Sequence, residues 1–306
     1  MIVIKAPLRV SLFGGGTDIP EYYSQHGSVI ISFALSRSIY LIHNERPTGG
    51  YRLSYSQVEE LDNLLKAEHT LVRIAERLYR FKSPCTLSII SDVPKGTGLG
   101  SSSALSVALV SLARPGLGKV ELLEEAYSLE RQVSPVGIQD FLPAIYGGFN
   151  IYDIDMNGHV KTTPAPLYLE KIIKQYGMLL YTGIDRDANR ILKKMPKSDK
   201  ELGRIHGTAE LARDNLDCFN HLTLAEALTV TWRHKRQISG VTSARLNNQF
   251  QAALQAGAHG GKLCGAGGGG CWFLIVSPGD RQKVREATGL TEIPFGIGGK
   301  MEVFHL

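Results

Sequence analysis

The feature that most constrains the fold is a run of glycines and serines, "PKGTGLGSSSA" at residues 94–104. It follows the apolar segment "CTLSIIS" at 85–91, whose β-branched and apolar residues are typical of a buried strand. It precedes "ALSVALVSLA" at 104–113, which is typical of a helix that Pro115 and Gly116 end. A strand, a glycine-rich turn and a helix in this order predict a chain that combines sheet and helix.

Periodicity predicts more strands and helices elsewhere in the chain. Strands are expected at 2–13, 28–45 (one or two), 177–183, 271–277 and 300–305, and a hairpin turn at Asn157-Gly158. Helices are expected at 58–81, 119–132, 205–219, 223–238, 243–257 and 279–288. A boundary between Asp153 and Thr163 then divides the chain into predicted domains of residues 1–155 and 156–306.

Composition excludes several classes of protein. The 306 residues are 43% hydrophobic and 21% charged, which is enough for one large domain or two smaller ones with a real core. The four cysteines show neither C-x-x-C spacing nor histidines at zinc-ligand intervals, so neither a disulfide framework nor a structural zinc site is predicted. Pro7 and Arg9 interrupt the N-terminal apolar stretch, and no apolar run has the length of a membrane span. We therefore expect a cytoplasmic protein with no membrane partner.

The net charge of +5 suits an anionic substrate. Apart from short clusters such as "RHKR" at 233–236, the basic residues are scattered along the chain. No basic stripe interleaved with aromatic residues is present, so we do not expect nucleic acid as a partner.

By itself, the segment at 94–104 has two interpretations: a helix start after a tight turn, or a loop that binds phosphate. Unpaired backbone N–H groups at a helix N-terminus attract anions, and glycine lets the backbone approach them. Two familiar phosphate motifs do not fit. No Gly-Lys pair is followed by Ser or Thr, as a Walker A loop requires, and residues 96–100 read G-x-G-x-G rather than G-x-G-x-x-G.

Two further glycine clusters accompany this segment: "APLRVSLFGGGTD" at 6–18 and "KLCGAGGGGCWF" at 262–273. The three motifs, in this order and across the whole chain, resemble those of the GHMP kinases, named for galactokinase, homoserine kinase, mevalonate kinase and phosphomevalonate kinase. The resemblance implies a two-lobed α+β fold. Its N-terminal α+β domain would contain a left-handed crossover, and its C-terminal domain would be ferredoxin-like.

The resemblance also implies a nucleotide site that holds ATP and Mg²⁺. The loop over the ATP phosphates would comprise Lys95, Gly96, Thr97, Gly98, Leu99, Gly100, Ser101, Ser102 and Ser103. Ser102 and Glu130 would hold Mg²⁺, a cation that prefers hard oxygen ligands. Read without the resemblance, Glu130 is an acidic residue on a solvated helix face.

Asp140 and Arg9 match the catalytic residues of the family. The aspartate would accept the proton of the attacking sugar hydroxyl. The fixed charge of Arg9 would stabilise the Asp140 carboxylate and offset charge on the transferring phosphoryl group. Without the motif, Arg9 could form an ion pair at a sheet edge.

The sugar side of the site would comprise Asp18, Gly16, Thr17, Gly267 and Gly268. Arg186 in "TGIDRDANRIL" at 182–192 is the expected contact for a substrate phosphate, although its acidic flanks depart from the family pattern. Arg190 and Lys235 are further candidates. Lys262 either reaches an anionic substrate or lies at the surface.

Within the family, the segments "GGGTD" at 14–18, "IQDFLPAIYGGFN" at 138–150 and "WRHKRQIS" at 232–239 are similar to those of sugar-1-kinases acting on D-glycero-D-manno-heptose 7-phosphate. This similarity implies ATP-dependent phosphorylation of the anomeric hydroxyl, giving the 1,7-bisphosphate, by a monomer or homodimer. Three alternatives stay open: a kinase of a free sugar such as fucose or galactose, a non-catalytic binding protein of the same fold, and a structural or nucleic-acid-binding protein.

Overall fold

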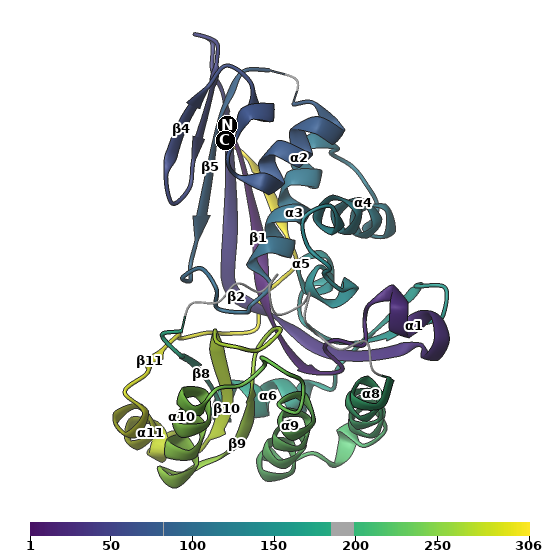
Figure 1. Cartoon of the computed structure of the whole chain (residues 1–306), viewed down its shortest axis with the longest axis vertical. Helices are drawn as coiled ribbons and strands as arrows, with labels where there is room; N and C mark the ends of the chain where they lie inside the picture. Colours follow the sequence, from purple (N-terminus) through teal and green to yellow (C-terminus); the bar gives the residue numbers. More distant parts are fainter. Residues whose placement is uncertain (82, 185–198) are drawn as a thin grey trace.

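The computed structural model describes residues 1–81, 83–184 and 199–306. It contains two sheets, one of eight strands and one of four, which occupy the upper and lower halves of Figure 1. Helices pack against both sheets. The fold is therefore α+β with two sheet-centred halves, as predicted.

The eight-stranded sheet is built around two long strands, β1 (Ile2–Phe13) and β2 (Ser28–Glu45). Both are rich in β-branched and aromatic residues, which favour strands. β2 is long enough to pair with β1, β5 and β6. The main strand order is β12-β1-β2-β5-β3-β4, with β6 and β7 branching from β2. The other strands are β3 (Tyr51–Ser54), β4 (Val58–Leu61), β5 (Cys85–Ser91), β6 (Phe149–Ile154), β7 (Val160–Pro164) and β12 (Glu302–His305).

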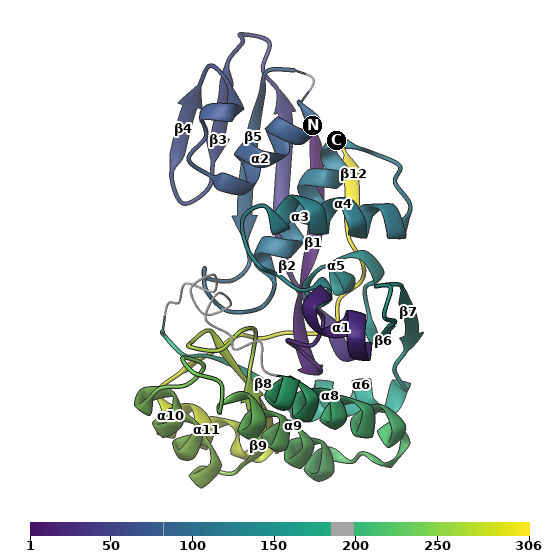
Figure 2. The ribbon, with the colours of Figure 1, turned by 45° about the vertical axis from the view of Figure 1, so that its right-hand side comes forward.

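Helices cover one face of this sheet (Figures 1 and 2). They are α1 (Pro20–His26), α2 (Thr70–Tyr79), α3 (Ser101–Ala113), α4 (Lys119–Arg131) and α5 (Leu142–Tyr146). The central helix α3 contacts β1, β2 and α4, and every residue from Ser103 to Val110 is buried. A helix enclosed in this way must be apolar on nearly all sides, which explains its run of alanine, leucine and valine.

The four-stranded sheet has the antiparallel order β11-β8-β10-β9. Its strands are β8 (Gly177–Tyr181), β9 (Ala258–Leu263), β10 (Cys271–Val276) and β11 (Thr291–Glu292). The helices in this half of the molecule are α6 (Leu167–Tyr176), α8 (Asp199–Asp214), α9 (His221–Lys235), α10 (Ala244–Gln255) and α11 (Arg281–Thr288), of which α8 packs on α9 and on β1 and β2. In chain order the strands are arranged 4-1-3-2 with helices in two of the connections, which is the predicted ferredoxin-like arrangement.

One predicted helix is wrong over half of its length. The helix expected at 58–81 begins only at Thr70, and Val58–Leu61 forms strand β4 instead. β4 pairs antiparallel with β3, placing Tyr51 opposite Leu61. Leucines spaced by three and four residues suggested a helix, but pairing with β3 overrides that local pattern because β3 extends the sheet beyond β5.

Two strands from the predicted second domain, residues 156–306, belong to the first sheet. The boundary between residues 155 and 156 falls in the turn between β6 and β7, and β7 pairs with β6. At the end of the chain, β12 pairs with β1, and Figure 2 shows the two termini side by side. Across the described residues, no helix combines the length and apolar character needed to span a bilayer.

Candidate active site

The glycine-serine segment forms a loop that connects β5 to α3. Gly100 occupies the N-cap position of α3 with φ +78°, a conformation that favours glycine. The first helical hydrogen bond runs from the Ala104 N–H to the Gly100 carbonyl at 2.9 Å, so the N–H groups of Ser101, Ser102 and Ser103 lie in the first turn before it. Such a helix N-terminus can hold a phosphate.

The side chains of this loop point in two directions. Thr97 and Leu99 are fully buried and anchor the loop in the core. Lys95 and Ser102 are exposed, and Gly96, Gly98 and Gly100 have positive φ angles that bring the backbone to the surface. Of the predicted nucleotide residues, Lys95 and Ser102 therefore have exposed side chains, while the side chain of Leu99 is enclosed in the core.

The third glycine cluster packs directly on the predicted phosphate loop, residues 94–104, although the strands that lead into the two loops belong to different sheets. A Cβ at Gly270 would lie 2.4 Å from the Thr97 carbonyl oxygen, and Gly270 has a φ of +94°. Its carbonyl accepts a hydrogen bond from the Thr182 N–H at 2.8 Å. Only glycine allows this close approach.

Gly267 and Gly268, predicted to line the sugar, pack against Val241. A Cβ at Gly267 would lie 2.5 Å from the Val241 Cγ1, and the Gly268 N–H donates to the Val241 carbonyl at 2.7 Å. The loop that contains them is thus held between the phosphate loop and the segment before α10.

Arg9 and Asp140 meet beside the phosphate loop. Arg9 is 2% exposed and lies on β1, and Asp140 ends a short 3-10 turn, Ile138–Asp140. The Arg9 Nε and Nη2 donate to the Asp140 Oδ1 at 2.9 and 2.6 Å, and Nη1 donates to the Gly98 carbonyl at 2.6 Å. The Asp140 side chain is 22% exposed, so its carboxylate is accessible to a ligand.

Glu130 on α4 is 3% exposed and faces α3, so its interpretation as a residue on a solvated face is wrong. Burial raises the pKa of Glu130 to about 7, and hydrogen bonds from Ser102, Ser103 and Ser106 partly oppose that rise. The Ser106 Oγ donates to Glu130 Oε2 at 3.1 Å. Sequence reasoning missed Ser106, yet its position one helical turn after Ser102 places both on one face.

These residues fit Mg²⁺. Within the described parts of the chain, no cation pairs with the buried Glu130 carboxylate, whose partners are hydroxyl groups. The described residues also contain no group of three or more acidic, histidine or cysteine side chains suited to hold a metal. Mg²⁺ commonly takes one or two protein oxygens and completes its shell with water and phosphate oxygens, which a carboxylate beside a phosphate loop allows.

Asp18 is 1% exposed and supports the turn that carries Asp140. Its two oxygens accept hydrogen bonds from the Gly16 N–H at 2.9 Å, the Gln139 N–H at 2.9 Å and the Gln139 Nε2 at 3.1 Å. Burial, followed by the nearby Asp140, raises the pKa of Asp18 to about 6. A Cβ at Gly137 would lie 2.0 Å from the Asp18 Oδ2, so a side chain there would displace the Asp18 carboxylate. No signal in the sequence identifies Gln139.

Thr17 is fully buried, and its side chain faces the protein interior. Its Oγ1 donates to the Gly14 carbonyl at 2.8 Å and lies 2.6 Å from the Ser28 Oγ. Thr17 and the Gly16 N–H therefore hold the loop after β1 in shape.

The cationic residues predicted to contact an anionic substrate lie in different environments. Arg186 and Arg190 lie outside the described residues. Lys235 is 5% exposed and donates to the Gly265 carbonyl of the third glycine cluster. Lys262 is 3% exposed, so a surface position is excluded.

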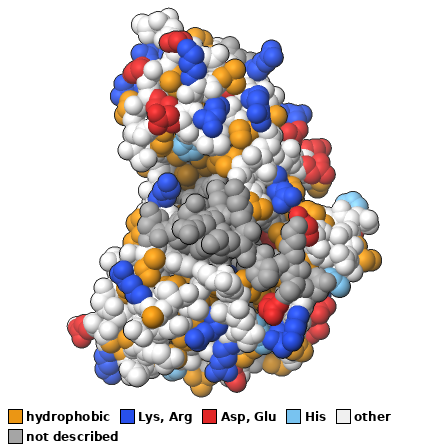
Figure 3. Space-filling view, viewed as in Figure 1, with side chains coloured by type: hydrophobic (Ala, Val, Ile, Leu, Met, Phe, Trp, Pro, Cys, Tyr) orange, Lys and Arg blue, Asp and Glu red, His pale blue; other side chains and the backbone are white. Residues whose placement is uncertain are grey.

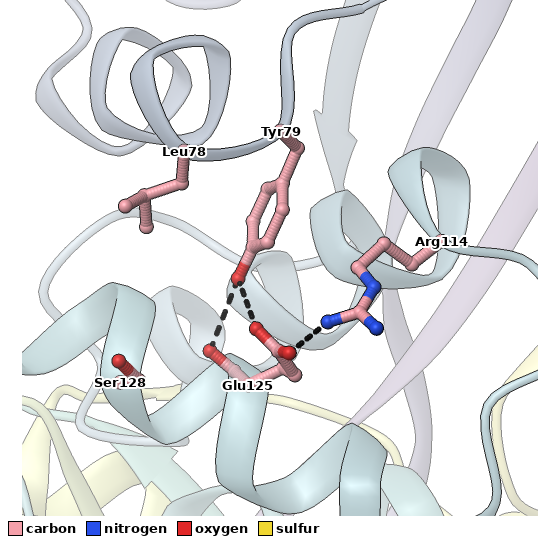
Figure 4. A pocket seen from close by; sticks show the side chains of 5 residues that line it. All are labelled: Leu78, Tyr79, Arg114, Glu125 and Ser128. Atoms are coloured by element: carbon pink, nitrogen blue, oxygen red, sulfur yellow. Dashed lines mark hydrogen bonds and ion pairs between the residues drawn. The ribbon is translucent and has the colours of Figure 1, made fainter.

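A separate surface pocket of about 480 Å³ lies among α2, α3 and α4 (Figure 4). Three of its polar side chains interact: Tyr79 donates to the Glu125 Oε2 at 3.0 Å, and Arg114 forms an ion pair with Glu125. It contains none of the residues of the candidate site. On the face in Figure 3, Lys and Arg side chains are scattered rather than gathered into a stripe.

Comparison with known proteins gives a consistent result. Residues 63–148 match the model of the GHMP kinases N terminal domain, and residues 210–288 match that of the GHMP kinases C terminal. The chain is 31% identical, over 90% of its length and 89% of the relative's, to the D-glycero-alpha-D-manno-heptose 7-phosphate kinase of Campylobacter jejuni. It is 29% identical, over 94% of its length and 91% of the relative's, to the mevalonate kinase of Pyrococcus horikoshii.

A solved structure has the same fold. The D-glycero-D-manno-heptose 1-phosphate kinase of Bacteroides thetaiotaomicron superposes with a TM-score of 0.79 at 22% identity, covering 100% of this chain and 99% of that one.

Proposed function

The chain belongs to the GHMP kinase family, and we propose that it transfers the γ-phosphoryl group of ATP to the anomeric hydroxyl of a sugar phosphate. The proposed substrate is D-glycero-D-manno-heptose 7-phosphate, and the product is the 1,7-bisphosphate. The observation that carries the proposal is Arg9, which hydrogen-bonds both Asp140 and the Gly98 carbonyl of the phosphate loop. One residue thus joins a candidate base to the place where phosphates bind.

Asp140 acts as the base. The C1 hydroxyl oxygen attacks the γ-phosphorus, the bond from that phosphorus to the ADP oxygen breaks, and the hydroxyl proton passes to Asp140. Because both Arg9 hydrogen bonds end on Asp140 Oδ1, the Oδ2 oxygen is left to accept the proton. The Arg9 charge offsets the negative charge that gathers around the phosphoryl group.

The phosphate loop and α4 supply the nucleotide site. The N–H groups of Ser101, Ser102 and Ser103 and the side chain of Lys95 bind the phosphates. Ser102 and Glu130 hold Mg²⁺, which when bound neutralises phosphate charge during transfer. The hydroxyl of Ser106 keeps the Glu130 carboxylate directed at Ser102.

The sugar lies on the other side of Asp140, between the loop of residues 14–18 and the third glycine cluster. Gly16, Thr17 and Asp18 shape that side from β1, and Gly267 and Gly268 shape it from the four-stranded half. The choice of a heptose 7-phosphate is supported by the 31% identical relative, whose name includes that substrate. Arg186 remains our candidate for the contact to the substrate phosphate.

The test measures ADP release by the purified protein with a panel of acceptors, each with Mg²⁺ and with excess EDTA. The panel contains D-glycero-D-manno-heptose 7-phosphate, the unphosphorylated heptose, fucose, galactose and mevalonate. We expect the heptose 7-phosphate to give the highest kcat/KM and EDTA to abolish the reaction. Phosphorus NMR of the product should show a second phosphate coupled to the anomeric proton.

Several outcomes would contradict the proposal. Faster turnover with a free sugar would indicate a different kinase of the same family. ATP binding without ADP release on any acceptor would favour the non-catalytic binding protein. A second phosphate coupled to any proton other than the anomeric one would refute the assigned position of transfer.

A further inference from the structure

A buried lysine connects the two sheets next to the candidate site. Lys262 lies on β9 of the four-stranded sheet, and its Nζ donates to two backbone carbonyls of β1, those of Ser11 at 2.9 Å and Leu12 at 2.7 Å. Its side chain therefore spans from the sheet that leads into the third glycine cluster to the strand that carries Arg9.

The two acceptors lie at an irregularity of β1. Ser11 pairs with Ser32 and Phe13 pairs with Ile31, so the register shifts and Leu12 has no partner residue on β2. A bulge of this kind interrupts the ladder and leaves backbone groups that need other partners. The ammonium group of Lys262 supplies two donors at this point.

Burial of this ammonium group opposes folding. Lys262 is 3% exposed, and burial lowers its pKa to about 8. Among the described residues it forms no ion pair with a carboxylate; the charged or titratable groups that influence it are Arg9 and the thiol of Cys264. An apolar side chain of similar volume would avoid this cost of desolvation, but it would leave the Ser11 and Leu12 carbonyls without their donors.

The position of Lys262 shows which segments of the candidate site its ammonium group connects. Arg9 precedes Ser11 on β1 by two residues, and the loop of residues 14–18 begins two residues after Leu12. On its own strand, Lys262 comes just before the glycine cluster whose Gly270 packs on Thr97. The lysine thus joins the first glycine motif to the third, and the third packs on the second through Gly270.

We propose that Lys262 is a positioning residue that ties the bulge of β1 to β9 and so holds the Arg9–Asp140 pair in register with the phosphate loop. The catalytic part of this role rests on the proposed kinase function. The structural part is that Lys262 protects the backbone of residues 11–18 from local opening. Hydrogen exchange measures this without any substrate.

The test compares Lys262→Met, which keeps the length and apolar stem but removes the donors, with Lys262→Arg, which keeps a cation and N–H donors. The matched control is Lys283→Met, at an exposed lysine of the same half. Backbone hydrogen exchange of residues 11–18 is measured in each protein without ligand, and kcat, nucleotide KM and the thermal midpoint are measured in parallel.

We expect exchange over residues 11–18 to be about tenfold faster in Lys262→Met, with a lower thermal midpoint because the Ser11 and Leu12 carbonyls lose their donors. We expect its kcat to fall at least about tenfold while the nucleotide KM stays within about threefold. Lys262→Arg should return both exchange and kcat toward native values, and Lys283→Met should match the native protein throughout.

The proposal is overturned if Lys262→Met exchanges like the native protein over residues 11–18 and keeps a native kcat. It is also overturned if kcat falls only as far as the folded fraction falls. Should Lys262→Met not fold, Lys262→Gln takes its place under the same criteria. If the native protein turns over no acceptor, the proposed function fails, and the exchange result still decides whether Lys262 orders the β1 bulge.

Discussion

Arg9 donates two hydrogen bonds to a single oxygen of Asp140, from Nε at 2.9 Å and from Nη2 at 2.6 Å. The usual arrangement of an arginine and a carboxylate uses both oxygens. Here the third donor, Nη1, goes instead to the Gly98 carbonyl. Arg9 therefore holds one oxygen of the Asp140 carboxylate at a fixed position relative to the phosphate loop.

Asp140→Asn should retain this arrangement and lose the reaction. The amide oxygen can replace Oδ1 and accept both Arg9 hydrogen bonds, while the amide nitrogen cannot accept a proton. We expect kcat to fall by about 10²- to 10⁴-fold, with the dissociation constant of a nucleotide unchanged within about threefold. Steady-state kinetics and calorimetric titration check the two values. Sugar phosphorylation at a nearly native rate would rule out Asp140 as the base.

Arg9→Met should lower both stability and activity. It leaves the Gly98 carbonyl and the Asp140 carboxylate without their donors, at a cost of about 1–3 kcal/mol in the free energy of unfolding. Urea denaturation measures this cost. The control is Lys5→Met. Lys5 lies on the same strand as Arg9 and forms an exposed ion pair with Glu302 of β12, so its replacement should change the free energy of unfolding by less than about 0.5 kcal/mol. If both substitutions lowered the free energy of unfolding equally, the hydrogen bonds of Arg9 would stabilise the fold no more than an exposed ion pair does.

Arg9→Lys separates charge from geometry. A lysine keeps the positive charge, but its compact ammonium group cannot reproduce the three directed hydrogen bonds of the guanidinium. We therefore expect kcat in Arg9→Lys to fall by at least about tenfold, measured with saturating substrates. A native kcat would show that charge alone is enough.

Glu130→Gln should change the pH dependence of stability in metal-free buffer. Burial raises the pKa of Glu130 from 4.5 to about 7, so between these values the folded protein retains a proton that the unfolded chain has lost. Stability therefore falls as pH rises from about 4.5 to about 7, and glutamine removes that fall. The difference in thermal midpoint, variant minus native, should grow over this range and then become constant.

The control for this measurement is internal. Asp18, whose pKa is raised to about 6, titrates in both proteins, so its contribution cancels from the difference. A difference that stays constant across the range would mean that Glu130 does not titrate as described. In activity assays, the same variant should need at least about tenfold more Mg²⁺ for half-maximal rate.

Gly270→Ala tests the contact between the third glycine cluster and the phosphate loop. The new Cβ would lie 2.4 Å from the Thr97 carbonyl oxygen, at a residue with φ +94°. We expect a loss of about 1–3 kcal/mol in stability and a weaker affinity for nucleotide, measured by denaturation and calorimetry. Gly279→Ala is the matched control, because a Cβ there meets nothing within 4 Å. Unchanged nucleotide affinity in Gly270→Ala would argue against this contact as a support of the loop.

Local pattern predicted most of the elements because their determinants are local. The strand at Cys85–Ser91, the helix that starts at Ser101 and the helices α9 and α10 follow from alternation, glycine placement and helical spacing. β4 was missed because the hairpin of β3 and β4 joins the sheet through β5, a strand about thirty residues further along the chain. The short helices α1 and α5 were missed because they lack a long period.

The sequence by itself determined that three glycine motifs are present, and that a carboxylate and an arginine accompany them. Only the tertiary structure decided how these residues meet. Glu130, which by sequence is an ordinary acidic residue on a helix, is buried, and burial raises its pKa to about 7. Lys262, which by sequence could lie at the surface, is buried and connects the two sheets. The physical reason is that burial and hydrogen-bond partners come from residues far apart in the chain, whereas backbone propensities come from neighbours.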